Sequence, residues 1–243
     1  MIDGNRKPTL AEDPQQGFSS DAPRNSGIIL IGPPASQTED RTVVITGLPR
    51  GGTTMAAQCL ALMGVPMGVK LPPPRHNFED KAFVALLQME EPSPIDMPRL
   101  RDLIKSRNDA HAVWGFKLPM AINSLPVLDR ELRNPRYILV FRDVVAVGSR
   151  ELMSAGIEAL FAMRRGLALQ ARMLRFAETS NSPCMLLSYE KALNAPAAVV
   201  NQIGSWCGLS PTDQQREQAC SVVRPDDPIY TSREDLTERQ PWP

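Results

Sequence analysis

The sequence predicts an α/β fold of three layers, with a central parallel sheet flanked by helices. Short apolar runs such as 42–46 and 137–141 are continuous, as expected for strands buried on both faces. Longer amphipathic segments separate these runs, which indicates strand–helix alternation. The length of 243 residues and an apolar content of 42% fit one domain with a sizeable core.

The chain begins with a polar segment. Residues 1–40 are rich in Pro, Ser, Asp, Asn and Gln, and we expect them to be mostly disordered. The exception is 27–31 (GIILI), an apolar run that forms either a short strand or a segment docked on the main sheet. We expect the domain itself to span 41–243, with an irregular, Pro-rich tail from about residue 224.

Strands and helices then alternate along the chain. Short β-branched or aliphatic runs predict strands at 42–46, 112–117, 137–141 and 184–188. Apolar residues at helical spacing predict helices at 53–63, 80–91, 100–107, 125–132, 157–177 and 197–207. Prolines mark the boundaries, because a Pro-rich stretch follows the first helix and Pro92 and Pro119 each end an element. The helix 157–177 carries methionines and arginines, and core packing is favoured over a basic face presented to a partner or lipid.

Composition excludes several classes of protein. The 27 basic residues balance the 27 acidic ones, which argues against a nucleic-acid partner. No run approaches the roughly 20 apolar residues of a transmembrane helix, and no secretory leader is evident, so we expect a cytoplasmic protein. The four cysteines have neither zinc-site nor redox-motif spacing, so we expect reduced, mostly buried thiols and no metal.

The segment 47–54 (GLPRGGTT) directly follows a buried-type strand and precedes a helix. Gly47 and the Gly51–Gly52 pair allow the backbone N–H groups to turn inward, and the helix adds its positive dipole end. Thr53 and Thr54 add hydroxyl donors. The alternative to an anion site is an ordinary Gly-rich turn. The anion site is favoured because the segment combines a preceding strand, this glycine spacing, two threonines and a cation.

The same segment departs from the nucleotide-triphosphatase loop G-x-x-x-x-G-K-[ST]. Thr53 occupies the lysine position, and the cation has moved into the loop as Arg50. Such a loop suits a 5′-phosphate with a charged group beyond it better than a triphosphate.

The run Pro-Arg-Gly-Gly-Thr-Thr resembles the 5′-phosphosulfate loop of sulfotransferases, which use 3′-phosphoadenosine 5′-phosphosulfate (PAPS) as donor. The resemblance spans roughly 41–210 and implies a P-loop-like fold, with Arg50, Gly51, Gly52, Thr53 and Thr54 binding the donor. Met55 stands where that family often has a tryptophan, and its C-terminal R-K-G segment is missing; Arg224 or Arg233 are candidate substitutes.

A second cluster, 141–150 (FRDVVAVGSR), looks like the family's 3′-phosphate motif. The resemblance implies that Arg142 grips the phosphate, since a guanidinium pairs with two oxygens. Ser149 is one residue closer than the family's serine, and Arg150 occupies that position, so the second ligand is Ser149, Arg150 or both. The alternative for Arg142 is a salt bridge with Asp143 or with a neighbour at a helix start.

Two further segments extend the resemblance. In 186–193 (LLSYEKAL), Tyr189 matches a tyrosine that lies near the adenine in the family, although a core position is the alternative. In 114–119 (WGFKLP), Lys117 matches a strand lysine that contacts the transferring group. A surface lysine with a buried stem is the alternative there.

The general base is the least determined residue of the expected site. The histidine that follows the strand lysine in animal-type enzymes is absent, since the chain continues with Leu118 and Pro119. Other sulfotransferases use a carboxylate, and the resemblance favours Glu79, followed by His76 and Asp80. Each has a structural alternative, and Asp80 is well placed to cap the helix that follows it.

The resemblance therefore implies sulfuryl transfer from PAPS to an acceptor hydroxyl of a carbohydrate, lipid or small metabolite, without a metal. A nucleotide kinase or NTPase on the same fold is one alternative, which a magnesium requirement would favour. A non-catalytic nucleotide-binding module is another, because the histidine is missing. The oligomeric state is left open.

Overall fold

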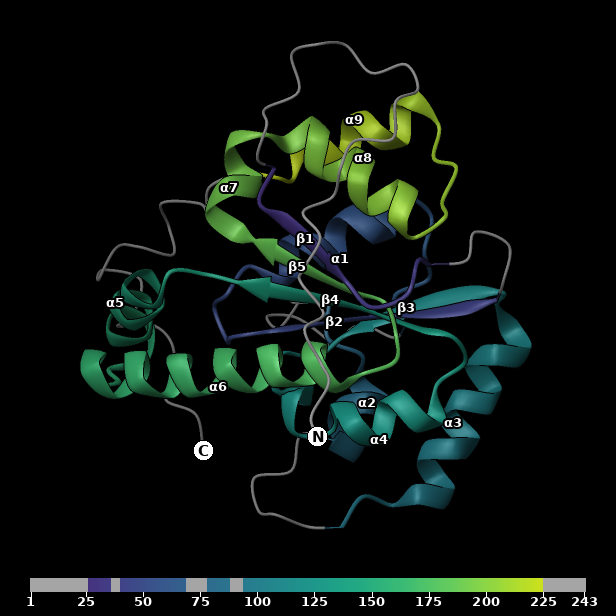
Figure 1. Cartoon of the computed structure of the whole chain (residues 1–243), viewed down its shortest axis with the longest axis horizontal. Coiled ribbons are helices and arrows are strands. Elements are labelled where there is room, and N and C mark those ends of the chain that lie inside the picture. The colour runs from purple at the N-terminus through teal and green to yellow at the C-terminus, as the bar shows by residue number, and fades with distance from the viewer. Residues whose placement is uncertain (1–25, 36–39, 69–77, 88–93, 225–243) are drawn as a thin grey trace, which may run out of the picture.

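The computed structural model describes residues 26–35, 40–68, 78–87 and 94–224 and is built around one five-stranded sheet (Figure 1). The strand order is β1-β5-β4-β2-β3. The strands are β1 (Ile28–Ile31), β2 (Arg41–Gly47), β3 (Val113–Lys117), β4 (Pro135–Phe141) and β5 (Cys184–Ser188). Strands β2 to β5 run parallel, whereas β1 pairs antiparallel with β5. The expected parallel sheet is confirmed, and the apolar run 27–31 adds an antiparallel edge strand to it.

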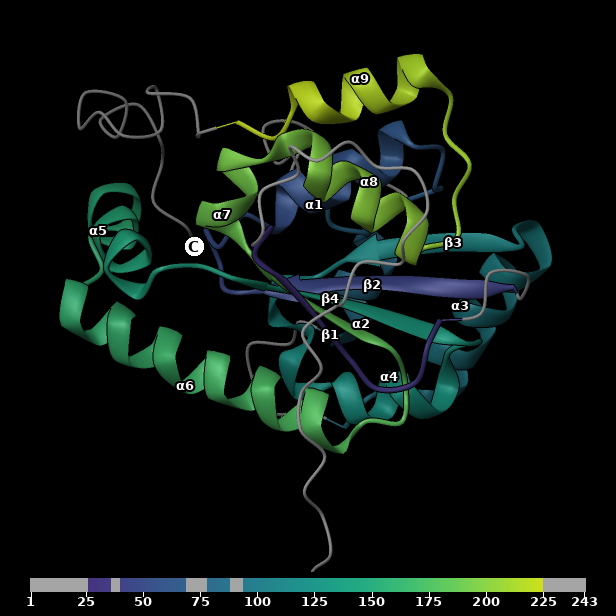
Figure 2. The same ribbon diagram turned by 45° about the horizontal axis from the view of Figure 1, so that its top comes forward.

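Helices cover both faces of the sheet, as Figures 1 and 2 show. One face packs against α1 (Thr53–Leu62), α8 (Pro196–Trp206) and α9 (Asp213–Ser221). The other packs against α2 (Lys81–Leu87), α3 (Met97–Ala110), α4 (Leu125–Glu131) and α6 (Ala159–Thr179). Successive residues of β2 alternate between these two cores, with Val43 and Ile45 in one and Val44 in the other. This double burial explains why the strands read as continuous apolar runs.

Three further elements connect these layers. A 3₁₀ helix (Pro119–Asn123) follows β3, and α7 (Tyr189–Asn194) follows β5. Helix α5 (Val144–Ala155) follows β4 and forms a hairpin with α6 (Figure 1).

Several element boundaries differ from those expected. Helix α3 begins earlier than residue 100, because the Asp96 carboxylate accepts from the Arg99 amide and caps it. Helix α9 was not expected, although Thr212 and Gln215 form a capping box there. The helix expected at 80–91 is seen as α2, and residues 88–91 lie outside the described part. The Pro72–Pro74 loop, most of 1–40 and the tail from 225 also lie outside it.

The strand order places the expected anion loop where the chain changes direction across the sheet. Strand β2 lies between β3 and β4, so the chain leaves β2 for one side and later returns on the other. In open α/β sheets, ligands bind beyond the carboxyl ends of the strands at such a change of direction. Residues 47–54 occupy this position.

Candidate functional site

The anion loop, residues 47–54, has a backbone suited to negative charge. Arg50 and Gly52 have left-handed φ values of 58° and 89°. Helix α1 begins directly after Gly52, and no side chain caps its first turn. The loop therefore leads directly to the positive end of the helix dipole.

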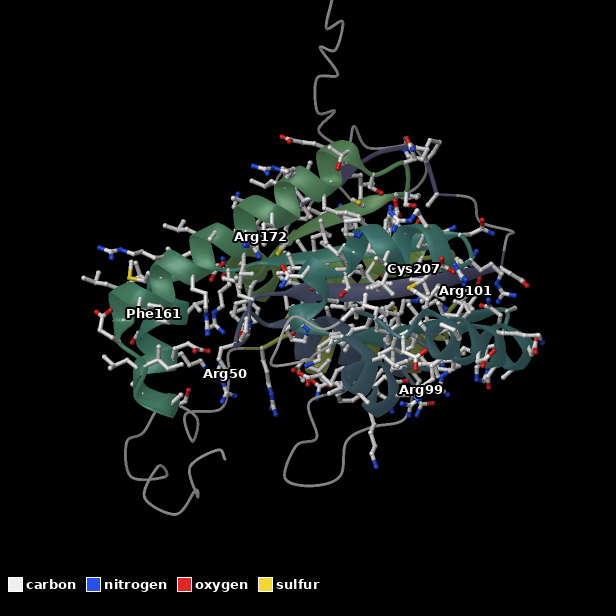
Figure 3. All side chains as sticks on the ribbon, turned by 90° about the horizontal axis from the view of Figure 1, so that it is seen from below. Arg50, Arg99, Arg101, Phe161, Arg172 and Cys207 are labelled. Atoms are coloured by element: carbon white, nitrogen blue, oxygen red, sulfur yellow. The ribbon has the colours of Figure 1, made fainter. Side chains whose placement is uncertain are left out.

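Arg50 is the exposed cation of this loop, whereas the glycines and Thr53 lie deeper. Figure 3 shows its side chain projecting from the ribbon at the end of the sheet. Left-handed φ is uncommon for a residue with a side chain, so the backbone at Arg50 is held by its surroundings. One such restraint is the hydrogen bond of 2.7 Å that Arg142 Nη1 donates to the Arg50 carbonyl.

Arg142 lies directly after β4, as expected, and joins several elements. Its guanidinium carbon is 4.3 Å from the ring centroid of Tyr189, within range of a cation–π contact. Its Nε is 3.9 Å from the Glu190 carboxylate. The expected alternative of a salt bridge near a helix start is met by Glu190 in the first turn of α7 rather than by Asp143, which accepts from the Ala146 amide and caps α5.

The ring of Tyr189 packs against the anion loop at Gly52. A Cβ atom at Gly52 would lie 2.1 Å from Tyr189 Cδ2, so only glycine permits this approach. The tyrosine is 3% exposed. It is therefore both near the anion loop and part of the core.

Lys117 and Glu79 form the second half of the site. Lys117 Nζ lies 3.0 Å from Glu79 Oε1 and 3.5 Å from Thr54 Oγ1, so it links the start of α1 to the carboxylate. The lysine side chain is only 2% exposed. It is not the surface lysine that the sequence left as an alternative.

Burial governs the electrostatics of this pair. Desolvation lowers the pKa of Lys117, the charge and hydrogen bond of Glu79 oppose that shift, and the charge of Arg50 reinforces it. The Lys117–Glu79 pair therefore lies beside the start of α1, and the Arg50 cation stands in the loop that precedes this helix.

The other candidates for the base have different positions. Asp80 is 1% exposed and accepts hydrogen bonds from the Ala82 amide at 2.8 Å and from Arg107 Nη2 at 3.0 Å. Asp80 therefore caps the start of α2, as the sequence predicted, and both of its carboxylate oxygens accept hydrogen bonds from within the fold. His76 lies outside the described residues.

The second part of the Arg142 cluster lies on α5. Ser149 is exposed on this helix, and Arg150 is half-buried. No hydrogen bond described in the structure joins Ser149 to Arg142, so the assignment of Ser149 or Arg150 stays a prediction. Arg224 is exposed after α9, and Arg233 lies outside the described residues.

Two residues of the site were missed in the sequence. Glu190 accepts a hydrogen bond of 3.0 Å from the Asp143 amide, which fixes the start of α5 against α7. Gln170 of α6 donates to the Arg142 carbonyl at 2.7 Å. Glu190 belongs to the Tyr-Glu pair of the segment 186–193, which is its only signal in the sequence, whereas no local pattern marks Gln170.

The described residues contain neither a cluster of metal ligands nor a membrane-spanning helix. Within those ranges no group of three or more His, Cys, Asp or Glu side chains is arranged to hold a metal ion. Among the same residues, no helix is both long and apolar enough to cross a membrane.

Comparison with known proteins adds a family and a fold. Residues 42–213 match the model of the family described as "Sulfotransferase family". The sulfotransferase domain of the Synechococcus PCC 7002 olefin synthase superposes with a TM-score of 0.53 at 16% identity, over 75% of this chain and 78% of that one. A sulfotransferase from Mycobacterium avium gives 0.50 at 14% identity, over 77% and 69%. No curated protein sequence matches the chain.

Proposed function

Because the chain belongs to the sulfotransferase family, we propose that it transfers a sulfuryl group from PAPS to an acceptor hydroxyl on a carbohydrate, lipid or small metabolite. The observation that carries the proposal is the Lys117–Glu79 pair beside the start of α1, with the Arg50 cation in the loop that precedes this helix. It supplies an anion site, cations and a potential base in one place.

The anion loop fits the 5′-phosphosulfate of such a donor. Its left-handed turns at Arg50 and Gly52 and the positive dipole end of α1 suit phosphate oxygens. The lysine of a triphosphatase loop is replaced by Thr53. We therefore infer that the loop prefers the donor nucleotide over ATP.

Arg142 would hold the 3′-phosphate of the same nucleotide. Its side chain is 12% exposed and braced by Tyr189 and Glu190, so little conformational entropy is lost on binding. Its hydrogen bond to the Arg50 carbonyl connects the two phosphate sites through one side chain.

The bound nucleotide supplies the sulfuryl group, and the chain's side chains supply charge and a proton acceptor. Glu79 would take the acceptor's proton as the acceptor oxygen bonds to sulfur and the S–O bond to the 5′-phosphate breaks. Arg50 and Lys117 would neutralise the charge that grows on the bridging oxygen. Adenosine 3′,5′-bisphosphate and the sulfated acceptor are the products.

Calorimetry with adenosine 3′,5′-bisphosphate in the absence of metal tests the donor site. We expect binding to the wild type, weakened at least tenfold in Arg142→Ala, because one charge-assisted contact contributes about 1.5–3 kcal/mol. Arg101→Ala is the matched control, since Arg101 is an exposed arginine paired with Glu131 away from the site. Its affinity should equal that of the wild type.

Other outcomes separate the alternatives. Tighter binding of ATP with magnesium than of the bisphosphate would replace the proposal with a kinase or NTPase. Bisphosphate binding without transfer of radiolabelled sulfate from PAPS to a panel of sugars, lipids and phenols would favour a non-catalytic nucleotide-binding module.

A further inference from the structure

Helix α6 exposes a leucine stripe, which we define as Leu160, Leu167 and Leu174. These side chains are 58%, 54% and 44% exposed. The helix is buried along a different line, Ala162, Gly166, Leu169, Met173 and Phe176. The stripe is offset from that line by two residues, about 200° around the helix, so it lies on the opposite side.

This pattern departs from an ordinary surface helix, whose outer face is polar. The three leucines recur every seven residues. On the same face, Arg164 and Ala171 lie between them and Glu178 follows one turn after Leu174, all three exposed. Alternating steps of four and three residues are the spacing by which one helix packs along another.

The stripe is open to a partner along its length. Figures 1 and 2 show α6 at the periphery of the molecule. Figure 3 shows Phe161 of α6 at the margin of the molecule. The exposures above show that no element of the described ranges covers the three leucines.

We propose that this face is a self-association surface, on which α6 packs antiparallel against α6 of a second copy of the chain. Arg164 and Glu178 determine the choice of partner and direction. They lie at opposite ends of the stripe, and neither forms an ion pair with another described residue. Antiparallel pairing brings each Arg164 toward the partner copy's Glu178, giving two opposite-charge contacts.

A parallel pair would do the reverse. It would set arginine against arginine and glutamate against glutamate, which is unfavourable at such positions. Ala171 near the middle of the stripe is small and lets the two helices approach closely, with leucines of each copy beside it. An isologous contact with two-fold symmetry is also the commonest way for identical chains to associate.

A lipid surface explains the same residues less well. Interfacial helices rely on a strongly basic polar face. Here two of the arginines on α6 are turned to the protein: Arg165 bonds Glu151 at 2.9 Å and Arg172 bonds Asn123 at 2.8 Å. Glu178 in the stripe would also oppose an anionic membrane.

Sedimentation equilibrium of the full chain over a range of concentrations tests the proposal. We expect a monomer–dimer equilibrium, weakened at least tenfold by Leu167→Lys, which places a charge at the centre of the contact. Ile29→Lys is the control, because Ile29 is an exposed apolar residue of β1 and its loss should leave the dimer intact. Circular dichroism verifies that each variant is folded.

Charge reversal tests the antiparallel direction. Arg164→Glu and Glu178→Arg should each weaken the dimer, and the double variant should restore it. A monomer at every concentration, or a dimer indifferent to Leu167→Lys, would overturn the proposal. So would a monomer that co-sediments with vesicles of phosphatidylcholine and phosphatidylglycerol and loses this binding in Leu167→Lys, since lipid would then be the partner.

Discussion

Lys117 is a buried cation whose position depends on two neighbours. Burial of an ammonium group costs free energy that only a close partner offsets, and Glu79 at 3.0 Å is that partner. The lowered pKa of Lys117 follows mainly from desolvation. A buried, desolvated ammonium group beside the start of a helix is more typical of a functional site than of a contact that stabilises the fold.

Adjacent carboxylates in this segment should respond differently to neutralisation. Both variants should lower the free energy of unfolding by up to about 3–5 kcal/mol, because Glu79→Gln unpairs the buried Lys117 and Asp80→Asn unpairs Arg107. Only Glu79→Gln should also lower kcat about 10²- to 10⁴-fold in the folded protein, if Glu79 is the base. Radiolabelled sulfate transfer and urea denaturation measure the two effects. Full activity in Glu79→Gln would exclude Glu79 as the base.

The site residues differ in how far the sequence could predict them. Arg50 and Lys117 were identified because a cation next to a glycine turn, or at a strand end, has a recognisable local pattern. Glu190 and Gln170 act on Arg142 and Asp143 across long sequence separations. Such contacts depend on how α5, α6 and α7 pack, which no local pattern contains.

At the scale of elements, the α5–α6 hairpin positions the start of α5 beside the anion loop. Glu151 is 5% exposed and accepts a hydrogen bond from Arg165, which joins the two helices. Gly148 lets them approach, since a Cβ atom there would lie 2.7 Å from Met163 Cγ and 3.0 Å from the Ala159 carbonyl oxygen. The hairpin therefore depends on close contact of backbones.

Gly148→Ala should destabilise the protein although alanine favours helices. Overpacking costs about 1–3 kcal/mol, which outweighs a propensity gain of at most about 1 kcal/mol. Gly156→Asn is the matched control, because Gly156 has a left-handed φ of 67° with nothing within 4 Å of a Cβ, and asparagine tolerates that conformation. Urea denaturation compares them. Equal stability of Gly148→Ala and the wild type would show that α5 and α6 can shift to accommodate the Cβ atom at little cost in free energy.

Element predictions succeeded where burial dictated the pattern. Strands β2, β4 and β5 are apolar throughout because helices cover both faces, and they fall where expected. Helices α7 and α9 were missed because they are short and largely polar, so their capping residues carried the only signal. The sequence predicted a helix at 157–177 but did not indicate which of its faces is exposed to solvent.

The whole molecule has two apolar cores separated by the sheet, and three cysteines lie within them. Burial raises the pKa of Cys59, Cys184 and Cys207 from 9.0 to about 12 in each case. The expectation of buried, reduced thiols is confirmed for these three, whereas Cys220 is only half-buried.

These thiols predict a loss of stability in alkali. Between pH 9 and about 12 they ionise in the unfolded chain but keep their protons in the folded one. The folded state then binds more protons, so the free energy of unfolding falls as pH rises, by roughly 1.4 kcal/mol per pH unit for each thiol. Stability is fully retained below pH 9.

Urea denaturation at pH 8 and pH 10, with reductant and constant salt, measures this decline. Cys59→Ala should be less stable than the wild type at pH 8, because it leaves a cavity. Its further loss between pH 8 and pH 10 should be smaller, because one thiol no longer titrates. An identical decline in both proteins would assign the effect to other groups.

The antiparallel edge strand has a consequence for how the chain is made. Strand β1 comes first from the ribosome, yet its partner is β5, which follows the other three strands in synthesis. Until β5 emerges, Ile28–Ile31 has no place in the sheet, and contacts of such long sequence separation form slowly. Closure of this edge is therefore expected to be a late folding event, during which the nascent chain carries an unpaired apolar strand that chaperones would recognise.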